Sequence, residues 1–188
     1  MRYLELISET RPPNSVWFAD SKVIDRNGTP LVVYHGTDAK FAQFAQGHKN
    51  GMTNRRNGFY FTDKLEAAQE FGDAHGYYLS IRRPADFRYD GGQEYVDRAL
   101  AHDPALAEQV TDAVGNRYGR GGGNTVGRLG SMGLLQTDAF LAALVGIGCD
   151  GMFFEDHFAG HSFTSFVAFE PSQIKRVTRT PLKAASPV

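Results

Sequence analysis

The chain has 188 residues, of which 41% are hydrophobic and 22% are charged, and its formal net charge at neutral pH is −1. This length suffices for one well-buried core and is short for two, so we expect a single domain over residues 1–188. The nearly balanced charge excludes a surface dominated by phosphate binding. Local basic pairs are still present, Arg82 with Arg83 and Lys175 with Arg176.

Cysteine content and hydropathy exclude further classes. The single cysteine, Cys149, excludes an intramolecular disulfide and a zinc site built from several cysteines, and it fits a small buried hydrophobic residue. No apolar run approaches the roughly 20 residues of a membrane span, and the amino end lacks the apolar stretch of a signal peptide. We therefore expect a cytoplasmic protein without membrane contact, or one delivered into a host cell without a signal. We also expect a monomer.

The first elements that the sequence predicts are two short strands, at residues 31–37 and 57–63. Both are rich in β-branched or aromatic residues, and both end in small or polar residues that favour a turn. Each also presents one side chain with useful chemistry, His35 in the first strand and Tyr60 in the second. A pocket that grips a flat ring linked to a sugar uses both kinds of side chain.

A short helix is predicted directly after the second strand. Asp63 and Glu66 have the D-x-x-E spacing of a capping box. Phe71 lies on the apolar face that follows, and Gly72 is a typical end for a helix. Residues 77–81 then predict another strand.

The second half of the chain mixes helical and extended segments. Helical patterns cover residues 93–114 and 138–145. Residues 118–133 between them are glycine-rich without periodicity, which predicts a long flexible loop or lid. Strands are predicted from residue 150 to 154 and from 166 to 169.

The order of these elements favours an α+β fold. Strands and helices are interleaved without the regular alternation of a doubly wound sheet. Within the single domain we assign the core to residues 20–177, a helical and glycine-rich insertion to residues 92–146, and a flexible tail to residues 178–188.

Two interpretations of His35 remain open from the residues alone. The first is a hydrogen-bonded histidine at a corner between a strand and a turn. The second is a binding residue, because an imidazole can hydrogen-bond a ribose hydroxyl while the neighbouring Gly36 lets a ligand approach the backbone closely.

The aromatic residues also allow two interpretations, a core role and a binding role. Residues 58–61 alone predict an edge strand whose aromatic rings belong to the core, but beside His35 one ring can instead be a stacking platform. Phe71 lies eleven residues after Tyr60. It fits a core position, and this is compatible with a ring that forms the wall of a pocket.

Other catalytic patterns are missing from the sequence. The histidines show no H-x-x-x-H spacing on a predicted helix, so we expect no metal site. The glycine-rich run at residues 119–123 lacks the Lys-Ser/Thr ending of a phosphate loop, and there is no G-x-S-x-G nucleophile elbow.

Taken together, these motifs resemble the ADP-ribosyltransferase superfamily in its branch with a His-Tyr-Glu triad, most closely the transferase domains of bacterial and phage polyvalent proteins. Residues 33–37 resemble the first family strand, and residues 57–71 resemble its tyrosine strand with the helix that follows. Residues 150–152 and 166–175 resemble the closing strands, so the resemblance spans roughly residues 20–177.

This resemblance implies a split β-sandwich of two small antiparallel or mixed sheets with flanking helices. It implies NAD as the co-substrate, without a metal. It also implies a set of NAD-binding residues: His35, Gly36, Thr37, Gly58, Phe59, Tyr60 and Phe71. In this set the rings of Tyr60 and Phe71 would enclose the nicotinamide. His35 and Tyr60 would in addition be catalytic.

One position departs from the family pattern. The catalytic glutamate of the family immediately precedes the aromatic and aliphatic run of the last strand, and Ser165 stands there in this chain. We assign Ser165 and Glu170 to the catalytic set, although Glu170 lies five residues further on and so on the opposite side of a regular strand. Glu155 and Asp156 on the preceding segment are further candidates for the carboxylate.

The function that the resemblance implies is mono-ADP-ribosylation. ADP-ribose would move from NAD to a macromolecular acceptor, protein or nucleic acid, with release of nicotinamide, as in a bacterial or phage toxin or effector. The alternative is a catalytically degenerate module that binds NAD or ADP-ribose. An RNA phosphotransferase of the same fold would need arginine and lysine side chains that converge on a phosphate. The candidates for such a site are Arg55, Arg56, Arg82, Arg83 and Arg120. Residues 156–164 correspond to an acceptor-recognition loop of the family or form an ordinary β-turn connection.

Overall fold

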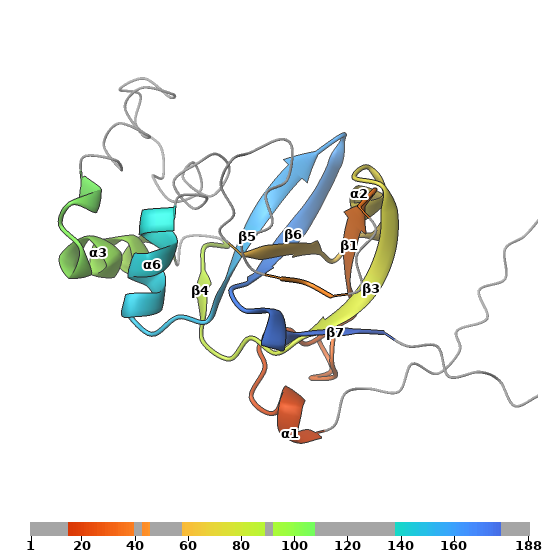
Figure 1. Ribbon diagram of the computed structural model, residues 1–188, viewed down its shortest axis with the longest axis horizontal. Helices are drawn as coiled ribbons and strands as arrows, with labels where there is room; N and C mark the ends of the chain where they lie inside the picture. Colours follow the sequence, from red (N-terminus) through yellow and green to blue (C-terminus); the bar gives the residue numbers. More distant parts are fainter. Residues whose placement is uncertain (1–14, 40–42, 46–57, 89–91, 108–137, 178–188) are drawn as a thin grey trace, which may run out of the picture.

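The computed structural model describes residues 15–39, 43–45, 58–88, 92–107 and 138–177 (Figure 1). The glycine-rich segment 118–133 and the tail 178–188, predicted above as flexible, lie outside these ranges. The elements in chain order are α1 (Ser15–Phe18), β1 (Val33–Thr37), β2 (Phe59–Thr62), α2 (Leu65–Gln69), β3 (Asp73–Leu79), β4 (Pro84–Asp86), α3 (Gln93–His102), α6 (Asp138–Gly146), β5 (Gly151–Phe158), β6 (His161–Ala168), the short 3-10 turn η2 (Pro171–Gln173) and β7 (Ile174–Arg176).

The described strands form one sheet that is nearly divided in the middle. Its order is β4-β5-β6-β2-β1-β3-β7, and the neighbours are antiparallel except for the parallel pair β4 and β5. A single residue pair, Tyr34 with Thr62, joins β1 to β2. We call β4, β5, β6 and β2 the first half-sheet, and β1, β3 and β7 the second half-sheet.

The two half-sheets enclose a shared hydrophobic core on their inner faces. Phe61 and Phe166 of the first half-sheet are buried in one cluster with Val33 and Tyr77 of the second. The α+β class and the sandwich-like arrangement are thus confirmed. Two separate sheets were predicted, but the Tyr34–Thr62 pair joins them into one sheet. With this pair, β1 and β2 can diverge while neither half-sheet leaves an unpaired edge between them.

Helices cover the outer face of the first half-sheet. Phe140 of α6 and Val96 of α3 pack with Met152, Phe154 and Val167, which alternate along β5 and β6 with the inward-facing residues. Figure 1 shows α3 and α6 side by side next to β4. The predicted helix at 93–114 is confirmed over residues 93–102, and the one at 138–145 is confirmed. The first ends at His102, two residues before Pro104.

Pairing extends several strands beyond the predicted segments. β3 begins at Asp73 rather than residue 77, since its polar first half pairs with β1, as in His75 opposite His35. β4 and β7 are three-residue strands at the two sheet edges, too short to give an alternating pattern. Local propensity did not indicate them because a distant strand supplies their hydrogen bonds.

The segment 156–164 is a β-hairpin. β5 and β6 pair along their whole length, from Gly151 opposite Ala168 to Phe158 opposite His161. The turn between them holds Ala159 and Gly160, both at positive φ. The segment thus contains the predicted β-turn connection, and its role toward an acceptor stays a prediction.

The predicted capping box at Asp63 and Glu66 is wrong. The N-cap of α2 is Lys64, and no side chain caps it. The Asp63 carboxylate instead accepts a hydrogen bond from the backbone N–H of Thr164, at 3.0 Å. The backbone N–H of a strand in another part of the chain competes for this carboxylate, and the contact ties β2 to β6.

Two simpler expectations can also be compared with the fold. Cys149 is buried, as predicted. In the part of the chain that the structure describes, no helix has the length and apolar character required to cross a membrane.

Candidate functional site

His35 lies where the two half-sheets part. Its Nδ1 atom is 2.8 Å from the backbone carbonyl oxygen of Tyr60. A carbonyl oxygen only accepts, so Nδ1 carries the proton and donates it in this hydrogen bond. The ring is half-buried on the inner face, with ring centroids of Phe44 and Phe61 at 5.1 and 5.5 Å.

Gly36 and Thr37 follow His35 on β1. The space that a side chain would take at Gly36 is filled by the backbone carbonyl of Ala68, so α2 packs directly on this strand. Thr37 accepts a hydrogen bond at its Oγ1 atom from the backbone N–H of Ala39, at 3.1 Å. The glycine therefore serves the close approach of a helix in this structure.

Tyr60 lies on the outer face of β2, opposite to the face that holds the His35 ring. Its ring packs edge-on against Phe154 at a centroid distance of 6.4 Å. Burial raises the pKa of the Tyr60 phenol well above its ordinary value, and the negative charge of Asp156 raises it further. Tyr60 thus remains a neutral ring with a protonated hydroxyl at physiological pH.

Gly58 and Phe59 lie at the start of β2. Phe59 is buried in the inner core and contacts Phe44 edge-on at 5.3 Å between centroids. Gly58 has a φ of +98°, and side chain and backbone atoms of Val167 and Ala168 occupy the space that a Cβ would need. Asn57, which begins the predicted strand, lies outside the described residues.

Phe71 lies two residues beyond α2 and is 46% exposed. Its ring stacks on Phe158 at the tip of the β5–β6 hairpin, with centroids 4.8 Å apart and an interplanar angle of 25°. Phe158 is itself 42% exposed. Within the described residues, the aromatic partner of Phe71 is therefore Phe158, and the ring of Tyr60 pairs elsewhere.

Ser165 lies beside a carboxylate on the outer face. It is only 4% exposed, and it is paired with Thr62 on one side and Phe154 on the other. Its hydroxyl is 3.4 Å from Oδ2 of Asp156. Asp156 is half-buried and lies on the same face as Tyr60, since residues that pair across the strands share a face.

Glu170 lies away from this group. It is exposed, follows the end of β6 and donates its backbone N–H to Oε1 of Gln173 at 2.8 Å. It lies five residues after Ser165, beyond the end of β6 at Ala168. The structure brings Tyr60, Ser165 and Asp156 together and does not bring Glu170 to them.

The sequence offered Asp156 as one candidate for the missing carboxylate but did not distinguish it from Glu155. The signal was available in the alternation along residues 152–158, where Phe154 and Asp156 share one face and Glu155 takes the other. That alternation becomes useful only once the register with β6 is known, because the register decides which residue lies beside Ser165.

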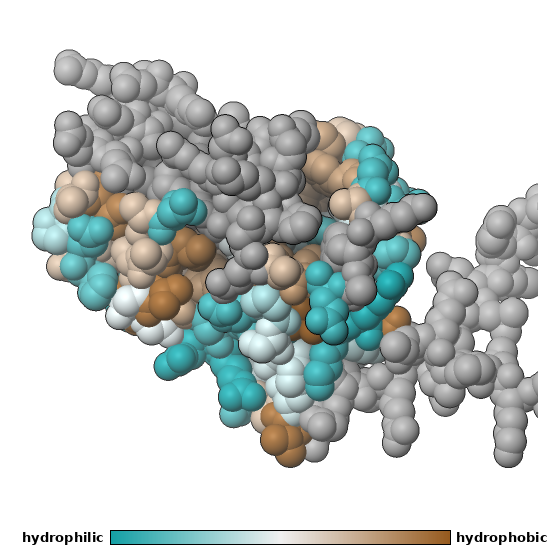
Figure 2. Space-filling model, viewed as in Figure 1, coloured by the Kyte–Doolittle hydropathy of each residue, from teal (hydrophilic) through white to brown (hydrophobic). Residues whose placement is uncertain are grey.

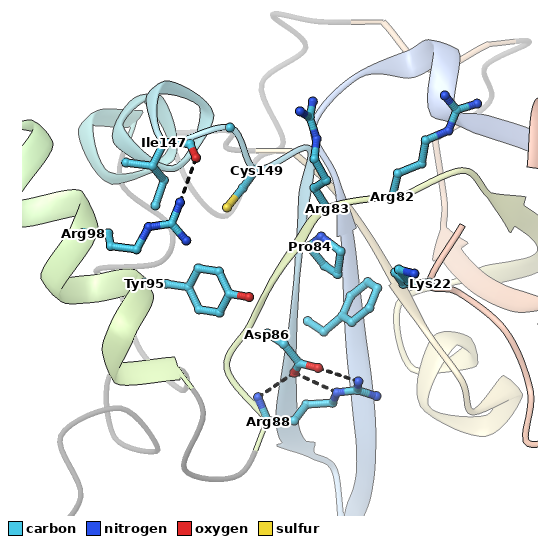
Figure 3. A pocket seen from close by; sticks show the side chains of 12 residues that line it. Lys22, Arg82, Arg83, Pro84, Asp86, Arg88, Tyr95, Arg98, Ile147 and Cys149 are labelled. Atoms are coloured by element: carbon cyan, nitrogen blue, oxygen red, sulfur yellow. Dashed lines mark hydrogen bonds and ion pairs between the residues drawn. The ribbon is translucent and has the colours of Figure 1, made fainter. Parts of the chain in front are cut away.

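A cavity in the described part of the molecule lies elsewhere, next to β4 (Figure 3). Its volume is about 710 Å³, and its cationic lining residues are Lys22, Arg82, Arg83, Arg88 and Arg98. Figure 2 shows hydrophilic residues over β4 and the segment that joins it to β3. A second cavity lies beside Phe44 and Tyr77. Neither cavity is lined by Tyr60 or Ser165.

No group of three or more His, Cys, Asp or Glu side chains suited to a metal occurs in the described ranges. Arg55, Arg56 and Arg120, candidates for a phosphate site in the sequence, lie outside those ranges. Arg82 and Arg83 are the described members of that set, and they share the cationic cavity.

Comparison with known proteins gives one family and one solved structure. No curated protein matches the chain. A solved structure described as the crystal structure of an anti-CRISPR protein matches with 14% identity and a TM-score of 0.42, over 78% of this chain and 95% of that one. A family model described as ADP-ribosyltransferase in polyvalent proteins matches residues 25–181. The chain therefore belongs to this family of ADP-ribosyltransferase domains.

Proposed function

We propose that the chain is an NAD-dependent mono-ADP-ribosyltransferase that moves ADP-ribose from NAD to a macromolecular acceptor and releases nicotinamide. The family supports the transfer of ADP-ribose in general. The proposal of NAD as the donor rests on one observation. The uncharged Tyr60 ring lies on the same face of the sheet as Ser165 and the Asp156 carboxylate.

These residues suit the chemistry of NAD. The nicotinamide of NAD is a flat cation, which an aromatic face and a nearby carboxylate both attract. Because Tyr60 stays protonated, its ring adds no charge of its own. Phe71 and Phe158 offer further aromatic surface at the exposed edge of the same region.

The reaction breaks the bond between the ribose anomeric carbon and the nicotinamide nitrogen. The electron pair leaves with nicotinamide, and the ribose passes through a state that resembles an oxocarbenium ion. Negative charge near that carbon stabilises it, and an oriented ribose lowers the entropic cost. His35 would orient the ribose through its imidazole, and its Nδ1 also holds the backbone of Tyr60 at 2.8 Å.

Incubation of the protein with labelled NAD and a cell lysate tests the proposal. We expect label on a macromolecule and stoichiometric release of nicotinamide. Tyr60→Ala should abolish both, whereas Tyr60→Phe should retain most activity because the ring stays. His35→Ala should lose activity, and its control is His75→Ala, an exposed histidine directly opposite on β3. Label that reaches no macromolecule in any lysate would contradict transfer.

The alternative is a binding module without turnover. Ser165 at the position of the family glutamate favours it, because a serine hydroxyl supplies no negative charge. A pure binder would show saturable NAD affinity by calorimetry and no nicotinamide release. Nicotinamide release above the background of the Tyr60→Ala variant excludes this alternative.

A further inference from the structure

The hairpin register brings a carboxylate to the position where the chain lacks a glutamate. Phe154 pairs with Ser165, and Asp156 pairs with Phe163 two positions along the same strands. Asp156 is thus the diagonal neighbour of Ser165, at about 7–8 Å between backbones, a distance that an Asp side chain can bridge. The 3.4 Å contact between the Ser165 hydroxyl and Oδ2 of Asp156 shows that it does.

The other nearby carboxylates do not meet this condition. Glu155 pairs with Thr164, so it faces the opposite side of the hairpin, and it is exposed. Glu170 lies beyond the end of β6. Asp63 accepts a hydrogen bond from the backbone N–H of Thr164.

Asp156 also acts electrostatically on Tyr60. Burial raises the pKa of the Tyr60 phenol most and the negative charge of Asp156 raises it further, and the strand register places both side chains on the outer face. Ser165, buried between Thr62 and Phe154, has a fixed position from which its hydroxyl can donate to Asp156.

We infer that Asp156 carries the carboxylate that stabilises the ribose cation and that Ser165 positions it. This inference rests on the proposed function. In the step, the glycosidic carbon–nitrogen bond breaks with its electron pair leaving on nicotinamide. An acceptor oxygen or nitrogen forms the new bond to the anomeric carbon and gives its proton to Asp156 or to water. The Asp156 carboxylate on β5 thereby takes the role of the family glutamate, whose position on β6 is occupied by Ser165.

Four variants test Asp156 by nicotinamide release. Asp156→Asn should lower the rate about a hundredfold or more, as loss of one transition-state electrostatic contact does. Glu155→Gln removes the adjacent charge on the other face and should leave the rate unchanged. Ser165→Ala should lower the rate less than Asp156→Asn. The double variant Asp156→Asn with Ser165→Glu should recover activity, because it returns the carboxylate to the family position.

A binding measurement keeps this inference separate from the proposed function. Calorimetry should show that Asp156→Asn weakens NAD binding about five-fold and leaves ADP-ribose binding unchanged, because only NAD carries the cationic ring. Equal rates and equal NAD affinities for Asp156→Asn and the wild type would overturn the role of Asp156. If Asp156→Asn weakens NAD binding in this way but the wild type releases no nicotinamide, the proposed function fails and the placement of the carboxylate stands.

A second inference rests on the cationic cavity beside β4. Five cationic side chains line it, from Lys22 in the segment before β1, from the residues around β4 and from α3, against one carboxylate, Asp86. That carboxylate is already engaged, since Arg88 binds it through Nε at 2.9 Å and Nη2 at 2.6 Å. The chain as a whole has a net charge of −1, so this excess is local.

Four cations of the lining remain besides Arg88: Lys22, Arg82, Arg83 and Arg98. In the described part of the chain, Lys22, Arg82 and Arg83 form no ion pair. Arg98 donates from Nη2 to the Ile147 carbonyl oxygen at 3.0 Å. Figure 3 shows Arg82 and Arg83 extending to one side of the cavity, away from Arg88, with Arg98 and Lys22 entering from opposite walls.

A nearby acidic residue orients the two neighbouring arginines through the backbone. The Asp150 carboxylate accepts the backbone N–H groups of Arg82, at 3.0 and 3.2 Å, and of Arg83, at 2.7 Å. The segment is therefore held while its guanidinium groups remain exposed. Cations spread around a volume of about 710 Å³ suit several phosphates in a row better than one.

The geometry points to a site for the phosphodiester backbone of a nucleic acid. Fluorescence anisotropy with labelled single-stranded DNA and RNA oligonucleotides tests it. The logarithm of the affinity should fall with the logarithm of the salt concentration with a slope of about −2 to −3, as expected for three to four neutralised phosphates. The DNA and RNA arms show which backbone is preferred.

Paired variants decide whether the cavity is the site. The Arg82→Gln and Arg83→Gln double variant should weaken binding at least ten-fold and reduce the salt slope by about 1.4. The matched control, Arg26→Gln with Arg176→Gln, removes two exposed cations elsewhere and should bind as the wild type does. No binding to either oligonucleotide, equal losses in the two double variants, or equally tight binding of polyglutamate would overturn the inference.

Discussion

At the residue scale, the Gln173 side chain connects the ends of β3 and β6 to the start of β5. Gln173 is only 9% exposed. Its Nε2 donates to the backbone carbonyl oxygens of Ser80 at 3.1 Å and Asp150 at 2.7 Å. Its Oε1 accepts from the backbone N–H groups of Phe169 at 3.0 Å and Glu170 at 2.8 Å. One amide thus satisfies backbone groups from both half-sheets.

Gln173→Leu should therefore destabilise the fold strongly. It leaves four backbone groups without this partner, and we expect the free energy of unfolding to fall by about 2–4 kcal/mol in urea denaturation. Gln93→Leu on the exposed face of α3 is the control and should change it by less than about 0.5 kcal/mol. Equal effects of the two substitutions would show that the Gln173 network is not important.

Gly36 shows a second constraint at this scale. Gly36→Ala should lower the free energy of unfolding by about 2–3 kcal/mol, because the new Cβ meets the Ala68 backbone carbonyl and must displace α2. Gly160→Ala has open space and a φ of +83°, so only backbone strain, about 1 kcal/mol, should result. A smaller loss for Gly36→Ala than for Gly160→Ala would contradict the packing of α2 on β1.

At the scale of elements, the stacked rings of Phe71 and Phe158 connect the end of α2 to the tip of the β5–β6 hairpin. A double-mutant cycle of Phe71→Ala and Phe158→Ala should give a coupling energy of about 0.5–1.5 kcal/mol in unfolding experiments. A cycle of Phe71→Ala with Val145→Ala, an exposed apolar residue on α6, should give none. Additive effects of the two phenylalanine substitutions would indicate that the stacking does not hold the hairpin.

At the scale of the whole molecule, a single residue pair and a shared core hold the two half-sheets together. Neither half-sheet can keep its inner face dry alone, so we expect them to unfold in one cooperative step. Trp17, the sole tryptophan, lies beside Lys175 of β7 in the second half-sheet, with the Lys175 Nζ atom 4.3 Å from its ring centroid. Its fluorescence and the far-ultraviolet circular dichroism should report the same urea midpoint. An earlier fluorescence transition would mean that the second half-sheet opens first.

Local patterns predicted the elements that carry their own signal. The strands around His35 and Tyr60, the α2 segment, α3 and α6 all have apolar residues at a recognisable period. β4 and β7 have three residues each, and the first half of β3 is polar, so only their pairing partners define them. The capping box failed for the same reason, because the Asp63 carboxylate binds the backbone of Thr164.

The sequence by itself determined the α+β class, the family and the two strands that bear His35 and Tyr60, since these depend on residue types at short spacing. Only the tertiary structure decided which side chains meet. The register of β5 against β6 places Asp156 beside Ser165, and a shift by one residue would put Glu155 there instead. The gathering of Lys22, Arg82, Arg83, Arg88 and Arg98 likewise depends on segments far apart in the chain. Contacts between distant segments depend on packing, and no local pattern encodes them.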